Sequence, residues 1–441
     1  MNQSRRFLSC VPMCAAMVVA LSSTPAVAKD ATTRPCADKV DGLTLPEGFC
    51  ASVFATGLGH ARHIAVHDNG DVYVSLRGED GGIVALRDTD GDGEADRDAK
   101  FGPRGGTGIG IRSGYLYFAM PTRIVRYALD GTRLVPRGRP EIVVDGFNRQ
   151  RAHATKTIAF DDAGGLYTNI GAPSNACQDP QRTPGTPGQD PCPELAQHAG
   201  IWRYDADATD QNAFEDGERY ATGIRNAVAT AWHSQVDSLY VVQHGRDQLS
   251  ELWPESFTTA QRVELPAEEF FDVGQGDDFG WPYCFYDPFQ KKKVLAPEYG
   301  GDGKEIGRCA SARDPLVGFP AHWAPNALLF YTGEQFPARY RGGAFVAFHG
   351  SWNRAPEPQR GYNVAFVPLD DGKVVADGDK PYTIFADGFA GSDVIPSPGS
   401  ATYRPTGLAQ TPDGALLVSD SRKGRIWRVS YNRTPAVSSG R

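Results

Sequence analysis

The sequence lacks the features of a membrane, nucleic-acid-binding or haem protein. After the first 28 residues, no apolar run approaches the roughly 20 residues of a membrane-spanning helix. The 45 basic residues are outnumbered by 53 acidic residues and form no stripe, which argues against a nucleic-acid partner. No C-x-x-C-H motif occurs, so covalent attachment of a c-type haem is excluded.

Residues 1–28 predict a secretory signal peptide. Arg5 and Arg6 precede an apolar run over residues 11–21, and residues 26–28 (AVA) form a small-x-small cleavage site. Phe7 follows the arginine pair too closely for a twin-arginine signal, so ordinary secretion is favoured. We therefore expect a periplasmic or secreted protein, with a formal charge of about −10 once these residues are removed.

Six cysteines remain after residue 28, in three pairs that are close in sequence. In an exported chain, disulfides are the natural interpretation of such pairs. Locality alone selects among the possible pairings and predicts bonds between Cys36 and Cys50, Cys177 and Cys192, and Cys284 and Cys309. Zinc is the alternative, but no C-x2-C spacing supports it.

Repeated short strands dominate the sequence, which holds 50 glycines and little helical periodicity. A polar cluster, an apolar strand, an acidic or glycine turn and a second strand recur six times. The copies span 59–76, 105–120, 153–171, 223–245, 324–352 and 405–420. A third strand follows most copies, as in 82–86 (GIVAL) and 425–429 (RIWRV). The repeats predict an all-β fold, a six-bladed β-propeller, with a pair of β-sandwiches as the alternative.

The propeller is predicted to span residues 29–431, followed by a disordered tail over 432–441. A strand near residues 49–54 is expected to complete the last blade beside 426–429, which closes the ring without a free edge. The two largest insertions, 172–199 and 283–322, each carry one predicted disulfide.

The third copy begins with an unusual polar stretch, HATKT (153–157), directly before the apolar strand 158–160. In a propeller, the innermost strand of each blade starts at one mouth of the central channel, so the residues ahead of it line that mouth. We call these residues the leaders; they are 62–63, 106–107, 153–157, 225–226, 323–326 and 404–406. Their polar and cationic side chains predict a pocket for an anionic or oxygen-rich ligand.

At these residues the chain resembles the glucose/sorbosone dehydrogenase family, six-bladed propellers that hold pyrroloquinoline quinone (PQQ). The similarity covers about residues 43–431. It is strongest in LPEGFCASVFATGL (45–58), HATKTIAFDDAGGLYTNIG (153–171), GIRNAV (223–228), GDDFGWPYC (276–284), FHGSWNR (348–354) and RPTGLAQTPDG (404–414). GDDFGWPYC and GSWNR are typical of the sorbosone or pyranose dehydrogenase branch.

The resemblance implies a catalytic role for His153, as the base that takes the hydroxyl proton of a sugar while hydride passes to PQQ. It implies that Arg225 and Asn226 lie at the cofactor, where Arg225 stabilises developing negative charge. It places Arg404, His349 and Arg354 against the cofactor carboxylates, to which arginine pairs well. Plain ion pairs along the channel are the alternative for the arginines.

The family also implies calcium and an aromatic contact. Gly245 and Arg246 match a backbone-carbonyl site for Ca²⁺. Trp323 is a candidate to stack on the cofactor or the sugar, with a core position as the alternative. Independently of the family, Asp88, Asp90 and Asp92 in DTDGDGEAD follow the first half of a calcium loop, although position 12 is alanine. A solvated acidic turn is the alternative there.

Together these patterns predict an exported, PQQ- and calcium-dependent dehydrogenase that oxidises the anomeric or aldehyde carbon of a sugar. A separate electron acceptor, a cytochrome or a quinone, would reoxidise the cofactor. Two other classes stay open. One is a metal-dependent lactonase, whose channel cation is held by acidic and amide side chains, whereas the leaders here are cationic. The other is a binding propeller without catalysis.

Overall fold

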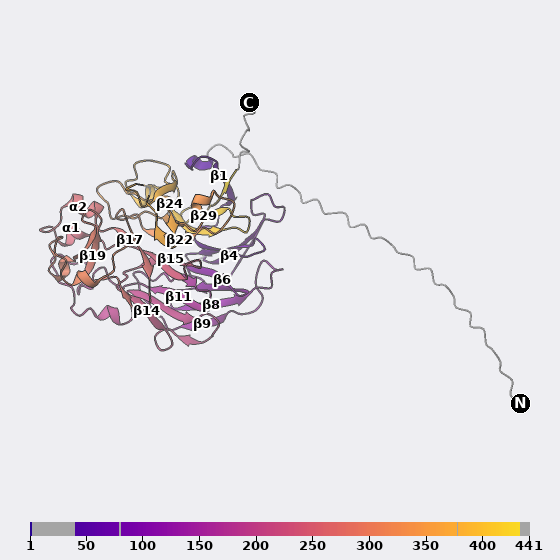
Figure 1. Ribbon diagram of the computed structural model, residues 1–441, viewed down its shortest axis with the longest axis horizontal. Coiled ribbons are helices and arrows are strands. Elements are labelled where there is room, and N and C mark those ends of the chain that lie inside the picture. Colours follow the sequence, from indigo (N-terminus) through magenta and orange to yellow (C-terminus); the bar gives the residue numbers. More distant parts are fainter. Residues whose placement is uncertain (2–39, 79–80, 377, 433–441) are drawn as a thin grey trace, which may run out of the picture. The chain divides into compact units, whose positions relative to one another are not determined.

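The structure, a computed structural model, describes residues 1, 40–78, 81–376 and 378–432 (Figure 1). The predicted signal peptide beyond Met1, Cys36 and the predicted tail beyond Asn432 lie outside these residues. Within the described ranges, no helix is long and apolar enough to cross a membrane.

Six antiparallel sheets form the blades, and each sheet begins with an innermost strand. Blade 1 contains β2 (Ala61–Val66), β3 (Val72–Leu76), β4 (Gly82–Arg87) and β5 (Arg97–Phe101). Blade 2 contains β6 (Gly108–Arg112), β7 (Tyr115–Ala119), β8 (Arg123–Ala128) and β9 (Glu141–Asp145). Blade 3 contains β10 (Ile158–Phe160), β11 (Gly165–Ile170), β12 (Gly200–Asp205) and β14 (Glu218–Thr222).

The second half of the ring repeats this arrangement. Blade 4 contains β15 (Ala227–His233), β16 (Ser238–Gln243), β17 (Glu268–Val273) and β21 (Val317–Phe319). Blade 5 contains β22 (Pro325–Phe330), β23 (Ala344–Phe348), β24 (Asn363–Val367) and β27 (Thr383–Ala386). Blade 6 contains β28 (Pro405–Gln410), β29 (Leu416–Asp420), β30 (Ile426–Tyr431) and β1 (Phe49–Ala55).

Each innermost strand contacts the innermost strand of the next blade, and β28 contacts β2, so the six blades form a closed ring. The six-bladed propeller is thereby confirmed. The N-terminal strand β1 pairs antiparallel with β30, with Phe49 opposite Tyr431 and Ala51 opposite Val429. The first and last parts of the chain therefore share one sheet, as the sequence predicted.

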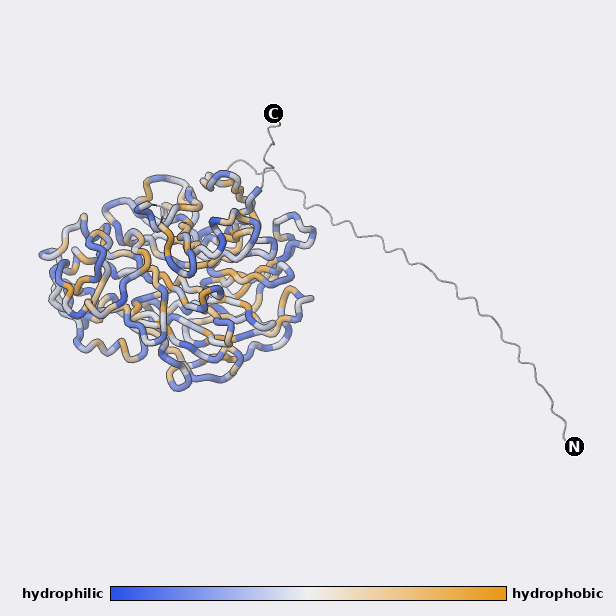
Figure 2. Tube along the Cα trace, in the orientation of Figure 1, coloured by the Kyte–Doolittle hydropathy of each residue, from blue (hydrophilic) through white to orange (hydrophobic). Residues whose placement is uncertain are grey.

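The hydrophobic core lies between neighbouring blades. One cluster joins Tyr167 of blade 3 to Leu239, Val241 and Phe271 of blade 4. Because neighbouring blades cover both faces of a sheet, the middle strands read as apolar runs; β3 and β23 are buried at every position. Figure 2 shows apolar residues concentrated in the strands and polar residues in the connections.

Four innermost strands begin with an irregular pairing to their neighbour. The register shifts lie between Ala61 and Ile64, Ala227 and Ala229, Pro325 and Ala327, and Pro405 and Leu408. Such bulges bend a strand and re-aim its side chains. Leaders predicted to precede their strands, such as Arg62, Asn326 and Thr406, therefore lie within the first residues of the strands and still reach the mouth.

The insertions carry the remaining elements. They include helices α1 (Leu249–Leu252) and α2 (Thr259–Glu264), and the hairpins β19–β20 (Cys284–Asp287, Lys292–Leu295) and β25–β26 (Leu369–Asp370, Lys373–Val374). Short strands β13 (Gln211–Asn212) and β18 (Asp277–Asp278) extend blades 2 and 3. The described residues also form six 3-10 turns: η1 (Val40–Gly42), η2 (Pro193–Ala196), η3 (Pro297–Tyr299), η4 (Gly307–Ser311), η5 (Ala338–Tyr340) and η6 (Pro398–Ser400).

Two predicted disulfides are confirmed: Cys177 bonds to Cys192, and Cys284 bonds to Cys309. Cys50 is also disulfide-bonded, and its predicted partner lies outside the described residues. The two cross-linked loops hold each other, because the Tyr283 hydroxyl accepts a hydrogen bond from the Cys192 amide at 3.0 Å. The first of these loops also contacts the segment between blades 3 and 4 that carries Arg225, because the Ala172 amide donates to the Arg225 carbonyl at 2.8 Å.

Candidate functional site

All six blades contribute to a cavity of about 310 Å³ at the mouth of the channel. We call it the mouth cavity. Its lining includes a leader from each blade: Arg62 and His63, Thr107, His153 to Thr155, Asn226, Ala324 and Asn326, and Thr406. Residues that follow the second strand of a blade also line it, among them Arg77, His244 and His349. The fold therefore brings the leaders together at the mouth of the channel, as the sequence predicted.

His153 is held in one orientation by its surroundings. Its backbone φ of 50° lies in the left-handed region, which is uncommon for a residue with a side chain. The ring Nδ1 lies 2.6 Å from the Ala172 carbonyl oxygen and donates to it, which leaves the Nε2 lone pair as the acceptor. Gly171 makes room for this arrangement, because a Cβ there would lie 2.7 Å from the His153 Cβ.

Burial is the main reason that the pKa of His153 falls to about 3, and the positive charge of Arg225 adds to it. The imidazole is therefore neutral at neutral pH and can accept a proton at Nε2. A bound anion would move the pKa back up, because negative charge favours the imidazolium.

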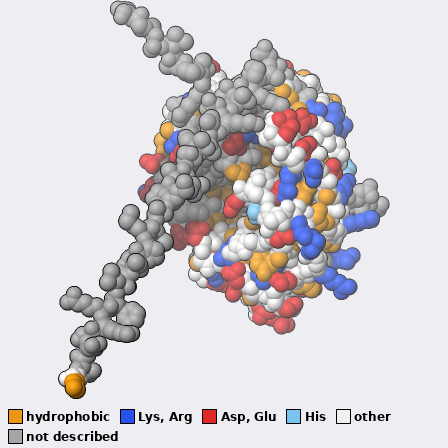
Figure 3. All heavy atoms as spheres, turned by 90° about the vertical axis from the view of Figure 1, so that its right-hand side faces the viewer, with side chains coloured by type: hydrophobic (Ala, Val, Ile, Leu, Met, Phe, Trp, Pro, Cys, Tyr) orange, Lys and Arg blue, Asp and Glu red, His pale blue; other side chains and the backbone are white. Residues whose placement is uncertain are grey.

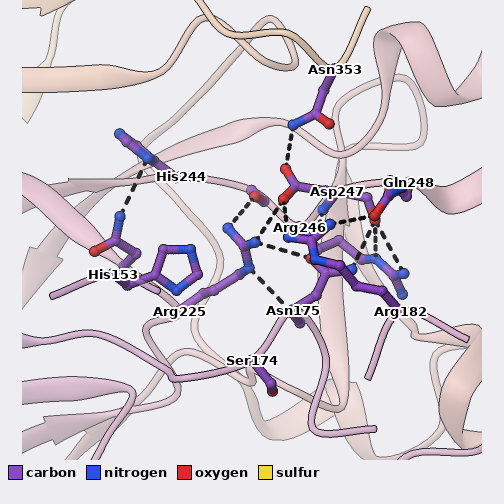
Figure 4. A network of polar contacts seen from close by, with 12 residues as sticks. His153, Ser174, Asn175, Arg182, Arg225, His244, Arg246, Asp247, Gln248 and Asn353 are labelled. Atoms are coloured by element: carbon purple, nitrogen blue, oxygen red, sulfur yellow. Dashed lines mark hydrogen bonds and ion pairs between the residues drawn. The ribbon is translucent and has the colours of Figure 1, made fainter. Parts of the chain in front are cut away.

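Arg225 lies beside His153 in a dense polar network (Figure 4). Its guanidinium donates to the Asn175 carbonyl at 3.2 Å, the Asn175 side-chain oxygen at 3.0 Å, the Gly245 carbonyl at 2.9 Å and Asp247 at 3.0 Å. A guanidinium has five N–H donors, so four are taken by groups of the described chain. Arg225 is buried and does not line the mouth cavity. The ion-pair alternative therefore describes its geometry better than direct cofactor contact.

Asp247 accepts from three side chains in this network, and the sequence analysis did not identify it. Its carboxylate accepts from Arg182 at 2.7 Å, from Arg225 at 3.0 Å and from the Asn353 amide. Although burial opposes ionisation, the two arginines hold the pKa of Asp247 well below its usual range. The carboxylate thus ties together the loops that follow β11, β16 and β23. A buried arginine needs a carboxylate partner, so a search for the partner of Arg225 could have identified Asp247.

Asn226 is positioned by two neighbours within the mouth. Its side-chain oxygen accepts from the Asn169 amide at 3.3 Å, and its own amide nitrogen lies 3.4 Å from His244 Nδ1. His244 Nε2 lies 2.7 Å from the Pro325 carbonyl, across the blade boundary. These contacts present Asn226 to the cavity in a fixed orientation.

A second, cationic cavity of about 780 Å³ adjoins the mouth cavity and shares Arg62, Arg77 and His349 with it. Its other charged lining residues are Arg404, Arg422 and Lys423. Burial, Arg77 and Arg404 together lower the pKa of Arg62 to about 9, and the Arg62 Nε atom is buried without a hydrogen-bond partner in the described chain. Crowded cations and an orphaned donor fit an anionic group. The sequence predicted Arg404 and His349 here but missed Arg77, Arg422 and Lys423.

Arg354 and Trp323 are not among the residues that line either cavity, and their predicted role at the cofactor stays a prediction. The Arg354 guanidinium is buried and donates to the Pro358 and Val263 carbonyls and to Glu264 at 2.8 Å. Trp323 packs its ring 5.2 Å from that of Phe348 in the core. Local partners satisfy the Arg354 guanidinium, whereas the Trp323 Nε1 atom is buried without a hydrogen-bond partner in the described chain.

Calcium at Gly245 and Arg246 stays a prediction, which the position of the Arg225 guanidinium does not favour. The Gly245 carbonyl already accepts from the Arg225 guanidinium at 2.9 Å, so a cation there would face another cation. The Arg246 side chain forms a buried ion pair with Glu298. We therefore derive no step through calcium at this position.

The acidic loop between β4 and β5 does bring its carboxylates together. Asp88, Asp90 and Asp92 each offer an oxygen within 4.8 Å of the others. Asp88 also accepts from the Gly91 and Gly93 amides at 2.8 and 2.7 Å, as it would in a plain acidic turn. Calcium binding by this loop stays a prediction.

Buried histidines at the mouth should make the fold sensitive to acid. Burial lowers the pKa of His63 and His244 to about 4, that of His153 to about 3 and that of His349 well below its usual value. The unfolded chain protonates these groups from about pH 6.5 downwards, so their stabilisation is complete above that pH and is lost as pH falls. Glu268, whose pKa burial raises to about 7, is one group acting in the opposite direction. We expect calorimetry to give a melting temperature several degrees lower at about pH 5 than at about pH 7; an equal or higher value at pH 5 would contradict this.

Comparison with known proteins gives evidence about the family of this chain that does not depend on the geometry of the site. A family model described as TrAA12-like matches residues 43–432. The pyrroloquinoline quinone-dependent pyranose dehydrogenase of Coprinopsis cinerea is 25% identical over 290 residues, which cover 57% of this chain and 38% of that protein. An uncharacterised protein of Borreliella burgdorferi is 29% identical over 217 residues, 49% of each chain. The chain thus spans half or less of the length of these curated relatives.

Solved structures share the fold. The calcium structure of the Trichoderma reesei carbohydrate-active enzyme of family AA12 superposes with a TM-score of 0.73 at 20% identity and covers 91% of this chain and 100% of that one. The holo form of the PQQ domain of pyranose dehydrogenase from Coprinopsis cinerea gives a TM-score of 0.71 at 19% identity, with 90% and 98% covered.

Proposed function

Because the chain belongs to the TrAA12-like family, we propose that it is an exported PQQ-dependent oxidoreductase. Its substrate would be an aldose- or sorbosone-type sugar, oxidised at the anomeric or aldehyde carbon. The observation that carries the proposal is one mouth that joins a neutral, oriented histidine to a crowded group of cations with no carboxylate among its lining residues.

The described residues fit PQQ, which carries several carboxylates. Arg62, Arg77 and Arg404 would hold these carboxylates, because arginine forms strong paired hydrogen bonds with them. The orphaned Arg62 Nε and the mutual repulsion of the three cations would both be relieved by an anion. When bound, PQQ would supply the two-electron acceptor for hydride.

His153 would act as the general base. Its Nε2 would take the proton of the sugar hydroxyl while Nδ1 stays bonded to the Ala172 carbonyl. Asn226, fixed by Asn169 and His244, would orient an oxygen of the cofactor or the sugar. Arg225 would position His153 and keep it neutral through its charge.

The remaining parts of the proposal concern partners and location. A separate acceptor, a cytochrome or a quinone, would take the electrons onward. The disulfides support an oxidising compartment, the periplasm or the exterior. The experiment tests calcium separately, because the Gly245 carbonyl already accepts a hydrogen bond from the Arg225 guanidinium.

The test is a titration of the mature protein with PQQ, with and without Ca²⁺, followed through the cofactor's absorbance. A panel of aldoses and sorbosone with a dye acceptor is then added. Tight binding and sugar-driven bleaching are expected. Absence of PQQ binding by a folded protein would overturn the proposal and favour a binding propeller, and cofactor-free, metal-dependent ester hydrolysis would favour a lactonase.

A further inference from the structure

A groove of about 1290 Å³ opens beside the mouth cavity and is lined by blade 2 and the end of blade 1. It shares Gly105, Pro121, Arg151 and Ala154 with the mouth cavity, so the two are adjacent. We call it the blade 2 groove. Its floor is apolar and includes Met120, Val125, Tyr127 and Ile142, which pack into one core cluster. A ligand in the mouth cavity could therefore extend outward along β8 and β9.

Arginines surround this floor, in a chain whose net charge is negative. They are Arg104, Arg123, Arg139, Arg149 and Arg151, and all five are exposed. Arg123 has one carboxylate at 4.0 Å, Asp145, which is also exposed, and such a pair contributes little. Over the described parts of the chain, the other four have no ion pair or hydrogen bond. Figure 3 shows lysine and arginine side chains gathered over part of the face on which blades 1 and 2 lie in Figure 1.

We propose that the blade 2 groove binds an acidic oligosaccharide, a chain of uronic acid units whose terminal sugar enters the mouth cavity. Unpaired guanidinium groups match carboxylates in charge and in their paired hydrogen-bond geometry. Proline, methionine and tyrosine side chains on the floor match the apolar faces of sugar rings. This inference rests on the proposed function, because it gives the same site a substrate class.

The shape of the groove favours a glycan over a protein. A concave space of this size buries a ligand of a few sugar units, whereas a docking protein needs a broad surface of roughly 800 Å² on each partner. Adjacency to the cavity that holds His153 adds a geometric reason, because a chain of sugar units can reach from one space into the other.

The experiment measures binding of trigalacturonic acid and of neutral maltotriose by calorimetry, on the mature protein without PQQ and at low salt. The test variant is Arg104→Ala/Arg149→Ala. The matched control is Arg339→Ala/Arg341→Ala, which removes the same charge from exposed positions in the connection between β22 and β23. Monomeric galacturonate is a further arm that separates a chain from a single carboxylate.

We expect trigalacturonic acid to bind at least about tenfold more tightly than maltotriose, the test variant to lose about tenfold or more, and the control to bind normally. Equal binding of both trisaccharides, no binding, galacturonate binding as tightly as the trimer, or an unaffected test variant would each overturn the proposal. Slower reduction of an acidic protein acceptor by the test variant, with unchanged trisaccharide binding, would assign the groove to that acceptor. Since the trisaccharide-binding assay needs neither PQQ nor turnover, failure of the proposed function leaves the binding result readable.

Discussion

Replacing His153 with alanine should lower kcat by about 10²–10⁴-fold while PQQ binding is retained. The imidazole supplies one neutral acceptor, Nε2; of the other histidines that line the mouth cavity, His349 lies 2.7 Å from the Ser421 hydroxyl through its Nε2. His63 has both ring nitrogens near backbone carbonyls, at 3.2 and 2.7 Å, and His244 Nε2 lies 2.7 Å from one. The measurement is dye-coupled sugar oxidation at saturating PQQ, with PQQ affinity titrated separately.

Two further variants separate catalysis from folding. His67→Ala removes a histidine from the turn between β2 and β3, where it contacts Asn69, and should leave turnover unchanged. Gly171→Ala keeps His153 but places a Cβ 2.7 Å from the His153 Cβ, so it should lower kcat by displacing the ring. Unchanged turnover in His153→Ala would remove the assignment of the base, and loss of PQQ affinity in that variant would make His153 a binding residue instead.

The ring of blades was predictable because it follows from local repetition. Each copy contains a polar leader, an apolar strand and a turn, and both the closing strand near Phe49 and the two described disulfides follow from spacing. Helix α2 was not predicted, although Thr258 and Gln261 form a capping box at its start, because six residues give too short an apolar period to recognise.

The site was only half predictable, since leaders identify one of the two segments that reach the mouth. The second strand of each blade runs antiparallel to the first, so the residues after it return to the same end. Arg77, His244 and Arg422 occupy such positions, and a rule based on leaders alone overlooks them. The contacts of Arg354 were not predictable for another reason: which partner satisfies an arginine depends on long-range packing, here against the end of α2.

Replacing Arg225 with methionine should cost about 3–5 kcal/mol of unfolding free energy. The change leaves Asp247 with one arginine in place of two and removes donors from the Gly245 and Asn175 carbonyls, all in a buried region. Urea denaturation measures the loss. Arg308→Ala is the control, because its ion pair with Asp190 is about half exposed on both sides and should contribute less than about 1 kcal/mol. Equal losses of unfolding free energy in the two variants would show that the network around Asp247 stabilises the fold no more than an exposed ion pair does.

The same substitution also tests how Arg225 acts on the base. Its charge is the second cause of the low pKa of His153, after burial. Arg225→Met removes that charge, so the pKa of His153 should rise and the acid limb of kcat/KM should move to higher pH. Arg225→Lys keeps the charge but cannot replace four hydrogen bonds, so it should lose stability with little movement of that limb. If the limb moves equally in both variants, Arg225 acts through geometry alone; if it moves in neither, burial alone keeps His153 neutral.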